Sequence, residues 1–163
     1  MTTAQTVAGA PDGSGARWLN EDEMSAWLPL LRLVQLLPQA LDGQLRGYAG
    51  VNHAHYTLLA VLSAQPDRRL PLTGLARAAA TSQSRTSHAV TALADRGLVT
   101  REPCPTDRRV QYVQITDAGL RLLEEHAPGH AAEVRRLVFD PLTRDDVDRL
   151  RRIALKLLPA LDT

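Results

Sequence analysis

Apolar residues recur every three or four positions over residues 27–45, which predicts a long amphipathic helix in the first third of the chain. Asn20 is a favourable N-cap for this helix, and the acidic residues 21–23 fill its first turn, where carboxylates complement the helix dipole. Pro29 and Pro38 fall inside the stretch, so we expect them to kink the helix.

The last third of the chain returns to the same spacing after Thr116, which predicts a second long helical stretch. Pro128 and Gly129 are expected to bend or interrupt it, because proline lacks the amide hydrogen that the helix needs. Residues 140–141 (Asp-Pro) mark a break, and Thr143 is expected to cap a final helix.

The centre of the chain has shorter elements. Residues 55–64 predict a short apolar helix, and residues 69–72 predict a piece of strand at a sheet edge, where a proline removes no hydrogen bond. We expect Thr73 to cap a helix that runs to residue 80. Ser82 is expected to cap the next helix, which stops at Gly97, a residue suited to the left-handed position after a helix.

Residues 98–102 and 110–116 have the β-branched, alternating character of strands, and they flank a basic tip at residues 103–109. Short helices followed by such a hairpin predict a winged helix-turn-helix. The expected fold class is therefore mainly α with a small β wing, in which helices from the two ends flank the winged domain.

The predicted organisation has four parts: a flexible tail at residues 1–16, an N-terminal dimerisation helix at 17–51, a winged helix-turn-helix DNA-binding domain at 52–116 and C-terminal dimerisation helices at 117–163. The tail is rich in glycine and small polar residues and has no apolar period. The terminal helices need a surface on which to bury their apolar faces, which an intertwined homodimer would supply.

Composition narrows the class of protein. The chain has 163 residues, 44% of them apolar and 4% aromatic, which favours a helical globular domain. It has no apolar run long enough to span a membrane and no signal-peptide pattern at residues 1–15, and Cys104 is its single cysteine, so we expect a cytoplasmic protein. Residues 73–110 carry six arginines against three acidic residues, so positive charge is concentrated where a polyanion would bind.

The helix after Ser82 divides into two faces at helical spacing. Thr86, Ala89, Val90 and Leu93 form a small apolar face that is expected to pack inward. The opposite face is polar and suits the major groove, where an arginine can form two hydrogen bonds to a guanine. Its members are Ser84, Arg85, Ser87, His88 and Thr91.

The wing sequence resembles that of MarR-type regulators. Residues 107–119 (DRRVQYVQITDAG) fit the family pattern D-x-R, three residues, V-x-[LI]-T, and a glycine three positions later. The resemblance implies that Arg109 enters the minor groove and that Asp107 orients it. Gly74 departs from the family, which often has an acidic residue there. The expected DNA contacts are Thr73, Ser82, Gln83, Ser84, Arg85, Ser87, His88, Thr91, Asp107, Arg108 and Arg109.

The resemblance also implies a homodimer that represses transcription from a pseudo-palindromic operator of double-stranded DNA until a small aromatic effector binds. Such proteins have a cleft between the dimerisation helices and the DNA-binding lobe. The candidates to line it are Trp18, Trp27, His53, His55 and Tyr56, although the tryptophans are equally suited to the core of the dimer. A regulator that senses no ligand is the alternative.

Other classes of function find less support. His126 and His130 have the spacing of a metal-binding pair, but Pro128 and Gly129 lie between them and no third ligand is evident, so no metal or cofactor is expected. Cys104 has arginines nearby but no second cysteine for redox chemistry. No catalytic triad or phosphate-binding loop is recognisable, so we expect no enzyme. A protein-interaction module that does not bind DNA remains the rival interpretation.

Overall fold

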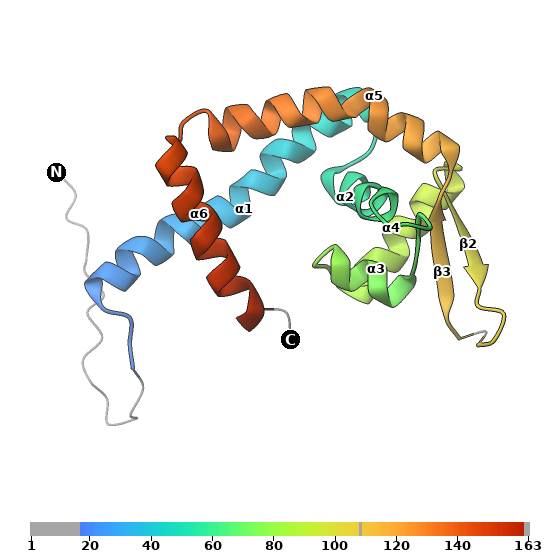
Figure 1. Cartoon of the computed structure of the whole chain (residues 1–163), viewed down its shortest axis with the longest axis horizontal. Coiled ribbons are helices and arrows are strands. Elements are labelled where there is room, and N and C mark those ends of the chain that lie inside the picture. Colours follow the sequence, from blue (N-terminus) through green and yellow to red (C-terminus); the bar gives the residue numbers. More distant parts are fainter. Residues whose placement is uncertain (1–16, 108, 162–163) are drawn as a thin grey trace. The chain divides into compact units, whose positions relative to one another are not determined.

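The computed structural model describes residues 17–107 and 109–161, so the predicted tail and Arg108 lie outside the described residues. The elements, in chain order, are α1 (Glu21–Ala49), α2 (His53–Ser63), β1 (Arg69–Pro71), α3 (Leu72–Ala78), α4 (Gln83–Asp95), β2 (Val99–Pro103), β3 (Gln111–Ile115), α5 (Asp117–Val134), a π-helical turn η1 (Arg135–Phe139), α6 (Arg144–Leu157) and a 3-10 turn η2 (Leu158–Ala160) (Figure 1). The predicted class, mainly helical with a small β wing, is confirmed.

The chain divides into two compact units, residues 1–36 and residues 37–163, and the division falls within α1. The described part of the first unit is residues 17–36, which include the start of α1. Asn20 caps this helix as predicted: its Oδ1 accepts the Glu23 amide at 2.8 Å, and the Glu23 carboxylate accepts the Asn20 amide at 2.9 Å. Neither Pro29 nor Pro38 interrupts the helix.

In the second unit, one hydrophobic core joins the short helices to the sheet. Leu59 and Leu62 of α2, Leu75 of α3, Leu93 of α4 and Val113 of β3 are all fully buried in it. Each such side chain contributes roughly 1.5–3 kcal/mol when it leaves water, so this core dominates the stability of the winged domain. It fixes the positions of the two elements next to the candidate site, α4 and the wing.

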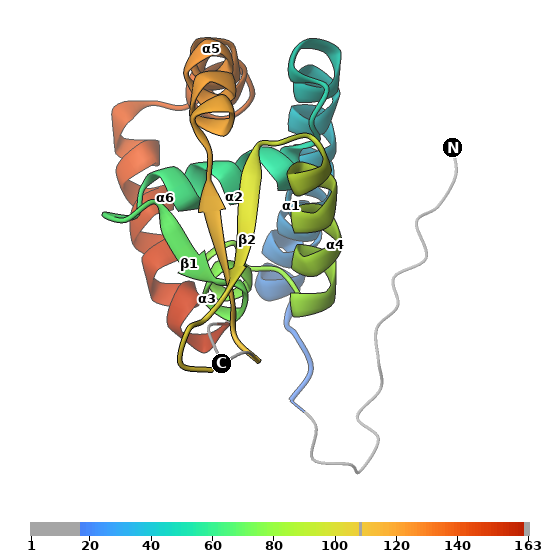
Figure 2. The ribbon, with the colours of Figure 1, turned by 90° about the vertical axis from the view of Figure 1, so that its right-hand side faces the viewer.

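The sheet has three antiparallel strands in the order β1-β3-β2, and Figure 2 shows them side by side. Leu70 pairs with Val113, and Val99 pairs with Ile115, so alternate residues face the core. β1 is an edge strand that contains Pro71, as predicted. Residues 104–110 connect β2 to β3 and form the tip of the wing.

The predicted start of α3 is wrong. The helix begins at Leu72, its N-cap position is Pro71 without a side-chain hydrogen bond, and Thr73 is an exposed residue of the first turn. The backbone passes directly from the edge strand into the helix, and the fixed φ of Pro71 suits this junction. α2 also begins earlier than expected, because the side chain of Asn52 caps it by accepting the His55 amide at 2.8 Å.

The predicted interruption of the C-terminal helical stretch at Pro128 and Gly129 is wrong as well. α5 continues through both residues, since a proline removes only one hydrogen bond from a long helix that packs on other elements. The irregularity comes later, in η1, where the Asp140 amide donates to the Arg135 carbonyl five residues back at 2.8 Å.

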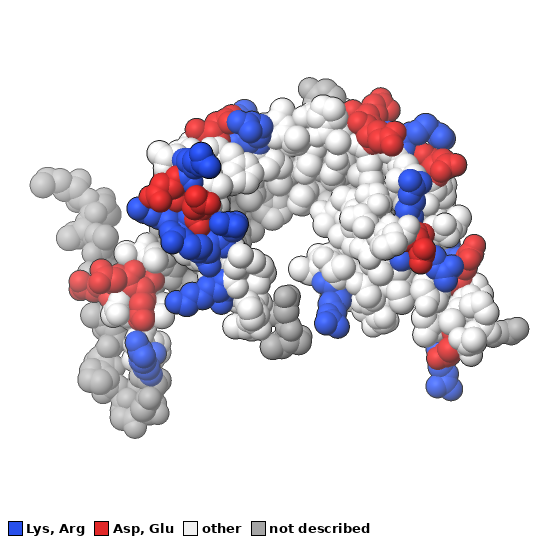
Figure 3. Space-filling model, in the orientation of Figure 1, with Lys and Arg blue, Asp and Glu red and all other residues white. Residues whose placement is uncertain are grey.

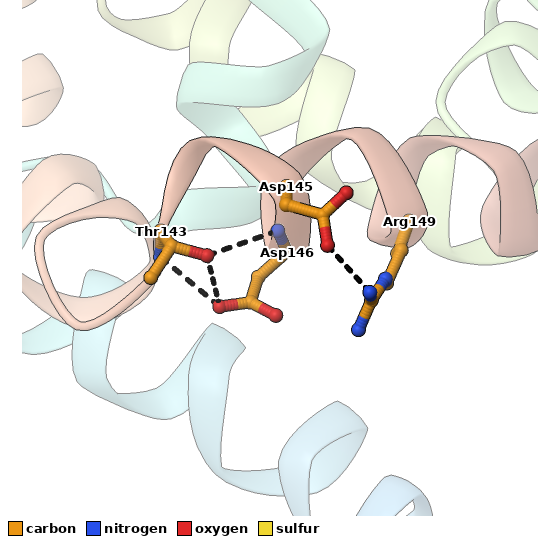
Figure 4. A network of polar contacts seen from close by, with 4 residues as sticks. All are labelled: Thr143, Asp145, Asp146 and Arg149. Carbon is orange, nitrogen blue, oxygen red and sulfur yellow. Dashed lines mark hydrogen bonds and ion pairs between the residues drawn. The ribbon is translucent and has the colours of Figure 1, made fainter.

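The last helix begins as predicted. Figure 4 shows the Thr143 hydroxyl accepting the Asp146 amide at 3.3 Å, while the Asp146 carboxylate accepts the Thr143 amide at 3.1 Å. Asp145 adds an ion pair with Arg149 one turn later. None of the helices that the structure describes is both long and apolar enough to cross a membrane.

Candidate nucleic-acid interface

α4 is the element on which the candidate site is built. The Ser82 hydroxyl accepts the Arg85 amide at 3.3 Å and so caps the helix, and Gly97 ends it with a φ of +68°, both as predicted. Thr86, Val90 and Leu93 are fully buried against the core. The hydroxyl of Thr86 donates to the Ser82 carbonyl at 3.0 Å, which satisfies this buried polar group.

The opposite face of α4 is open to solvent. Gln83, Ser84, Arg85, His88 and Thr91 are exposed, as the helical spacing predicts, whereas Ser87 is half-buried. The Thr91 hydroxyl donates to the Ser87 carbonyl at 3.0 Å, so its single hydrogen is already used within the helix. The exposed face therefore offers a guanidinium, an amide, an imidazole and hydroxyls to solvent, from a helix that the core holds in place.

Arg101 is a member of this surface that sequence reasoning missed. It pairs with the buried Val113 across β2 and β3, on the same side of β2 as the buried Val99. Its guanidinium donates to the Thr91 hydroxyl at 3.1 Å and so links the wing to α4. The alternation of Val99 and Arg101 in the sequence was the available signal, because residues two apart share one face of a strand.

The wing tip is held by its own backbone. The Cys104 amide donates to the Val110 carbonyl, and the Val110 amide donates to the Asp107 carbonyl, both at 2.9 Å. The Asp107 carboxylate accepts the Arg109 amide at 3.0 Å, and the Arg109 side chain is exposed. Asp107 therefore contacts Arg109 through the backbone, while the neighbouring Arg108 lies outside the described residues.

The base of the wing joins α5 closely. The Thr116 hydroxyl donates to the Gly97 carbonyl at 2.7 Å and accepts the Gly119 amide at 3.2 Å, so one side chain ties the end of α4 to the start of α5. Gly119 is buried, and a Cβ atom there would collide with the Leu98 carbonyl oxygen and lie 2.7 Å from Ile115 Cγ1. Helix α5 can approach the wing this closely because residue 119 is glycine.

Known proteins share this arrangement. A model of the MarR family matches residues 49–110. The crystal structure of Sco3205, a MarR family transcriptional regulator from Streptomyces coelicolor in complex with DNA, is 40% identical to this chain; the match covers 90% of this chain and 92% of that one, with a TM-score of 0.84. The chain belongs to the MarR family.

Two further solved structures are also similar to this chain. AbsC from Streptomyces coelicolor is 34% identical over 90% of this MarR-family chain and 98% of its own, with a TM-score of 0.81. CouR from Rhodococcus jostii RHA1, solved bound to p-coumaroyl-CoA, is 25% identical over 82% of this chain and 90% of its own, with a TM-score of 0.68. The protein is thus a DNA-binding transcription regulator, in a family of regulators rather than enzymes.

The structure brings together some of the residues that were predicted to line an effector cleft in this MarR-family protein. The rings of Tyr56 and His130 have centroids 4.7 Å apart, and those of His53 and His130 are 5.9 Å apart. Burial lowers the pKa of His55, and the positive charge of Arg96 lowers it further. Trp18 and Trp27, which belong to residues 1–36, expose 64% and 45% of their surface in the single chain.

Within residues 17–107 and 109–161, the remaining candidates give no second site. In the part of the chain that the structure describes, no group of three or more His, Cys, Asp or Glu side chains is placed to hold a metal ion. The Cys104 sulfur lies 3.2 Å from the Thr106 hydroxyl, which lowers the pKa of the thiol. A shallow hollow of about 450 Å³ lies on the outer face of the sheet, where the Arg69 guanidinium stacks 4.4 Å from the centre of the Tyr112 ring.

Charge is distributed unevenly along the regulator but is nearly balanced overall. Figure 3 shows basic and acidic side chains interspersed along α5 and α6 on one face of the molecule, in keeping with the formal net charge of +1. Among the residues on or next to the exposed side of α4 and the wing, Arg85, Arg101 and Arg109 carry positive charge. Electrostatic attraction to DNA is therefore expected from the interface itself rather than from the net charge.

Proposed function

We propose that this regulator binds a pseudo-palindromic operator as a homodimer and represses transcription by occupying it. The observation that carries the proposal is the separation of faces on α4, which buries Thr86, Val90 and Leu93 and leaves its polar residues exposed beside the wing. A helix held in this way can enter the major groove. Sco3205, which is 40% identical, was solved in complex with DNA, which supports the same mode of binding here.

The proposed contacts divide by role. Arg85 reads a base in the major groove, and the hydroxyls of Ser82 and Ser84 bind phosphates or base edges nearby. Arg109, at the wing tip, enters the minor groove and responds to its width rather than to its sequence. Thr73, Gln83, Ser87, His88, Thr91, Asp107 and Arg108 complete the proposed interface. Arg101 adds a further cation between the wing and α4.

The homodimer is supported by apolar surface that the single chain leaves open. In the start of α1, exposed apolar residues include Trp27, Leu30 and Val34, and in α6 they include Leu150 and Ile153. No residue of α6 is buried in the single chain, although this helix is amphipathic and well capped. Surfaces of this kind usually mark an interface, and a second copy of the chain is the partner that we propose.

We also propose that a small aromatic ligand controls the regulator by binding beside His53, His55 and Tyr56; the assignment of Trp18 and Trp27 to this ligand stays a prediction from the sequence. CouR, which was solved bound to p-coumaroyl-CoA, supports an aromatic acyl group as the chemical class. Aromatic rings with a few polar groups suit such a ligand. The ligand would act by favouring one spacing of the two DNA-binding lobes over the other.

Selection of bound duplexes from a random pool, followed by fluorescence anisotropy on the selected duplex, tests DNA binding. We expect two half-sites about 34 Å apart, one helical turn of DNA, because a twofold dimer places its two recognition helices in successive major grooves. Affinity should fall steeply with salt, since each phosphate contact releases counterions. Weak binding that is indifferent to sequence and salt would instead favour a protein-interaction module.

Titration of phenolic acids into the complex of protein and selected duplex tests the ligand. Release of DNA at ligand concentrations that leave the protein folded supports effector control. Complete indifference to aromatic acids and their thioesters would leave a regulator whose occupancy of the operator depends on its abundance alone. A reporter gene behind the selected duplex separates repression from activation by the direction of its change.

A further inference from the structure

Helices α2 and α5 meet at a cluster of three rings, His53, Tyr56 and His130, which we call the histidine joint. The His130 ring lies 4.7 Å from the ring of Tyr56 and 5.9 Å from that of His53, measured between centroids. α2 packs against the recognition helix α4 and is part of the DNA-binding lobe, whereas α5 leads from the wing towards the C-terminal helices. The joint is therefore a contact between the DNA-binding lobe, through α2, and the long helix α5 that follows the wing.

One ring nitrogen of each histidine in the joint lacks a hydrogen-bond partner among the described residues, and so does a nearby glutamine oxygen. These atoms are His53 Nδ1, His130 Nδ1 and Gln44 Oε1, and all three are buried. The Gln44 amide lies against the residue before His130, because a Cβ on Gly129 would be 3.3 Å from Gln44 Nε2. An imidazolium ion needs acceptors for two N–H groups, so these surroundings favour the neutral form of both histidines.

The charges around the joint do not reverse this preference. Burial lowers the pKa of both His53 and His130, and the positive charge of His53 lowers the pKa of His130 further. Asp42 opposes the shift at His53, yet its carboxylate already accepts the His53 backbone amide at 2.8 Å and pairs with Arg46 at 2.8 Å.

The charged and titratable groups on the neighbouring helical turns also do not reverse the preference of the two histidines for the neutral form. On α2, burial and then Arg96 lower the pKa of His55, so this neighbour is also neutral near pH 7. Burial raises the pKa of Tyr56, which keeps its hydroxyl neutral near pH 7. On α5, Glu133 accepts two hydrogen bonds from Arg136, at 2.6 and 2.9 Å.

We propose that the histidine joint is a proton-sensitive contact between α2 and α5, and that its protonation lowers the affinity of the regulator for its operator. Two imidazolium ions at this separation repel each other in a partly buried site. Acidification therefore weakens one of the contacts that hold α2, and with it α4, against α5. The inference rests on the proposed function in one respect, since DNA binding is its readout.

The sign of the effect follows from the direction of the pKa shifts. A histidine whose pKa is lowered in the folded protein is mostly neutral in both the folded and the unfolded state above pH 6.5. In that pH range its burial therefore carries no cost of releasing a proton. As the pH falls below 6.5 and through the lowered pKa, the unfolded or opened form binds the proton more tightly. The closed joint is thus favoured at neutral pH and lost in acid.

Fluorescence anisotropy on the selected operator, from pH 8.0 down to pH 5.5 at constant ionic strength, tests the proposal. The wild type is compared with the double variant His53→Gln/His130→Gln, which keeps polar side chains but cannot gain these protons. We expect the wild type to lose about tenfold in affinity per pH unit in acid for each coupled proton, and the double variant to lose far less. His88, on the exposed side of α4, is present in both proteins, so the comparison isolates the two substituted residues.

The matched control is His126→Gln, which removes a histidine one turn earlier on α5 and leaves the joint intact. It should follow the wild-type pH profile, and each single variant should show a shallower profile than the wild type. Circular dichroism at each pH confirms that the proteins compared are folded. Parallel loss of affinity in the wild type and the double variant would overturn the proposal.

An NMR titration of the imidazole C–H signals provides a second readout that does not involve DNA. We expect pKa values below 6.5 for His53 and His130, and a rise of the His130 pKa in His53→Gln, because that variant removes the like charge. A pKa at or above 6.5 for both residues would overturn the proposal even if operator binding depends on pH. Failure of the wild type to bind any duplex at pH 7.5 contradicts the proposed function instead, and the NMR result still decides the joint.

Discussion

Gly119 lies where α5 passes over the base of the wing, and its lack of a side chain is what permits this approach. Replacement by alanine places a Cβ atom against the Leu98 carbonyl oxygen and 2.7 Å from Ile115 Cγ1, so backbone or core must move. We expect Gly119→Ala to lower the free energy of unfolding by about 1–3 kcal/mol, the usual range for overpacking. Urea denaturation followed by circular dichroism measures this change.

The matched control is Gly74→Ala, in the first turns of α3, where the nearest atom to a new Cβ would be 3.6 Å away on Pro71. This substitution should raise the free energy of unfolding by about 0.4–1 kcal/mol, because alanine restricts the unfolded chain and favours the helix. Equal effects of the two substitutions would show that close approach at Gly119 does not matter.

Arg101 is expected to contribute a phosphate contact from the wing strand. Arg101→Ala should weaken operator binding and reduce the slope of log affinity against log salt by about 1, since one cation no longer displaces counterions. Thr91→Val removes the hydroxyl that holds the guanidinium at 3.1 Å but keeps the charge, so it should weaken binding with little change in slope.

Arg69→Ala removes the same charge from the outer face of the sheet, where the guanidinium stacks on Tyr112, and serves as the control. Its salt slope should match that of the wild type. An Arg101→Ala slope equal to the wild-type slope would reduce Arg101 to a structural role in the wing.

Replacement of Arg85 by alanine should affect sequence discrimination, whereas replacement of Arg109 by alanine should affect overall affinity for DNA. Arg85→Ala is expected to relax discrimination at one operator position by about 1–3 kcal/mol, because a base contact is lost. Arg109→Ala should weaken binding to all duplexes to a similar extent, since the wing responds to the shape of the minor groove. Affinities measured for the selected operator and for its single-base variants distinguish the two, and a loss of specificity in Arg109→Ala would reverse the proposed roles.

At the scale of the elements, the N-terminal cap of α6, which the sequence predicts, can be tested by its contribution to stability. Thr143→Ala removes the hydroxyl that accepts the Asp146 amide, and we expect a loss of about 1 kcal/mol in the free energy of unfolding. Asp145→Asn, in the same turn, removes an exposed ion pair with Arg149 and one first-turn carboxylate, and should cost about 0.5 kcal/mol. Thermal unfolding at fixed protein concentration compares the two variants, and a larger loss in Asp145→Asn would contradict this ranking.

Caps and faces could be predicted from sequence because they depend on neighbours within a few residues. Asn20, Ser82 and Thr143 all cap helices as expected, and the buried face of α4 follows the 3.6-residue period. Breaks were harder to predict. Pro128 does not interrupt α5, because the rest of the helix and its packing offset one missing hydrogen bond. Thr73 is not a cap, because Pro71 leads the edge strand directly into α3.

At the scale of the whole molecule, contacts between residues far apart in the chain could not be predicted from the sequence. His53 and Tyr56 were expected in a ligand cleft, but the contact with His130 joins positions more than 70 residues apart and follows only from how α2 packs on α5. Arg101 was missed for a similar reason, since its partner Thr91 lies on another element. The predicted domain boundaries, the homodimer and the DNA contacts stay predictions.

The proposed dimer interface can be disrupted without unfolding the single chain, because its residues lie on the surface of that chain. Ile153 on α6 is 57% exposed in the single chain, so Ile153→Glu should leave the winged domain folded but place a charge inside the proposed interface. We expect the wild type to sediment at twice its chain mass of 17.8 kDa and Ile153→Glu to sediment as a monomer at micromolar concentration.

Operator binding should fall with dimerisation, because one half-site supplies only part of the contacts of the full site. Ile153→Glu is therefore expected to bind the full operator little better than a duplex with a single half-site. Arg152→Gln changes the net charge by the same amount on the opposite face of α6, and it should remain a dimer with wild-type affinity. A monomeric wild type, or a dimeric Ile153→Glu with full affinity, would place the interface elsewhere than on α6.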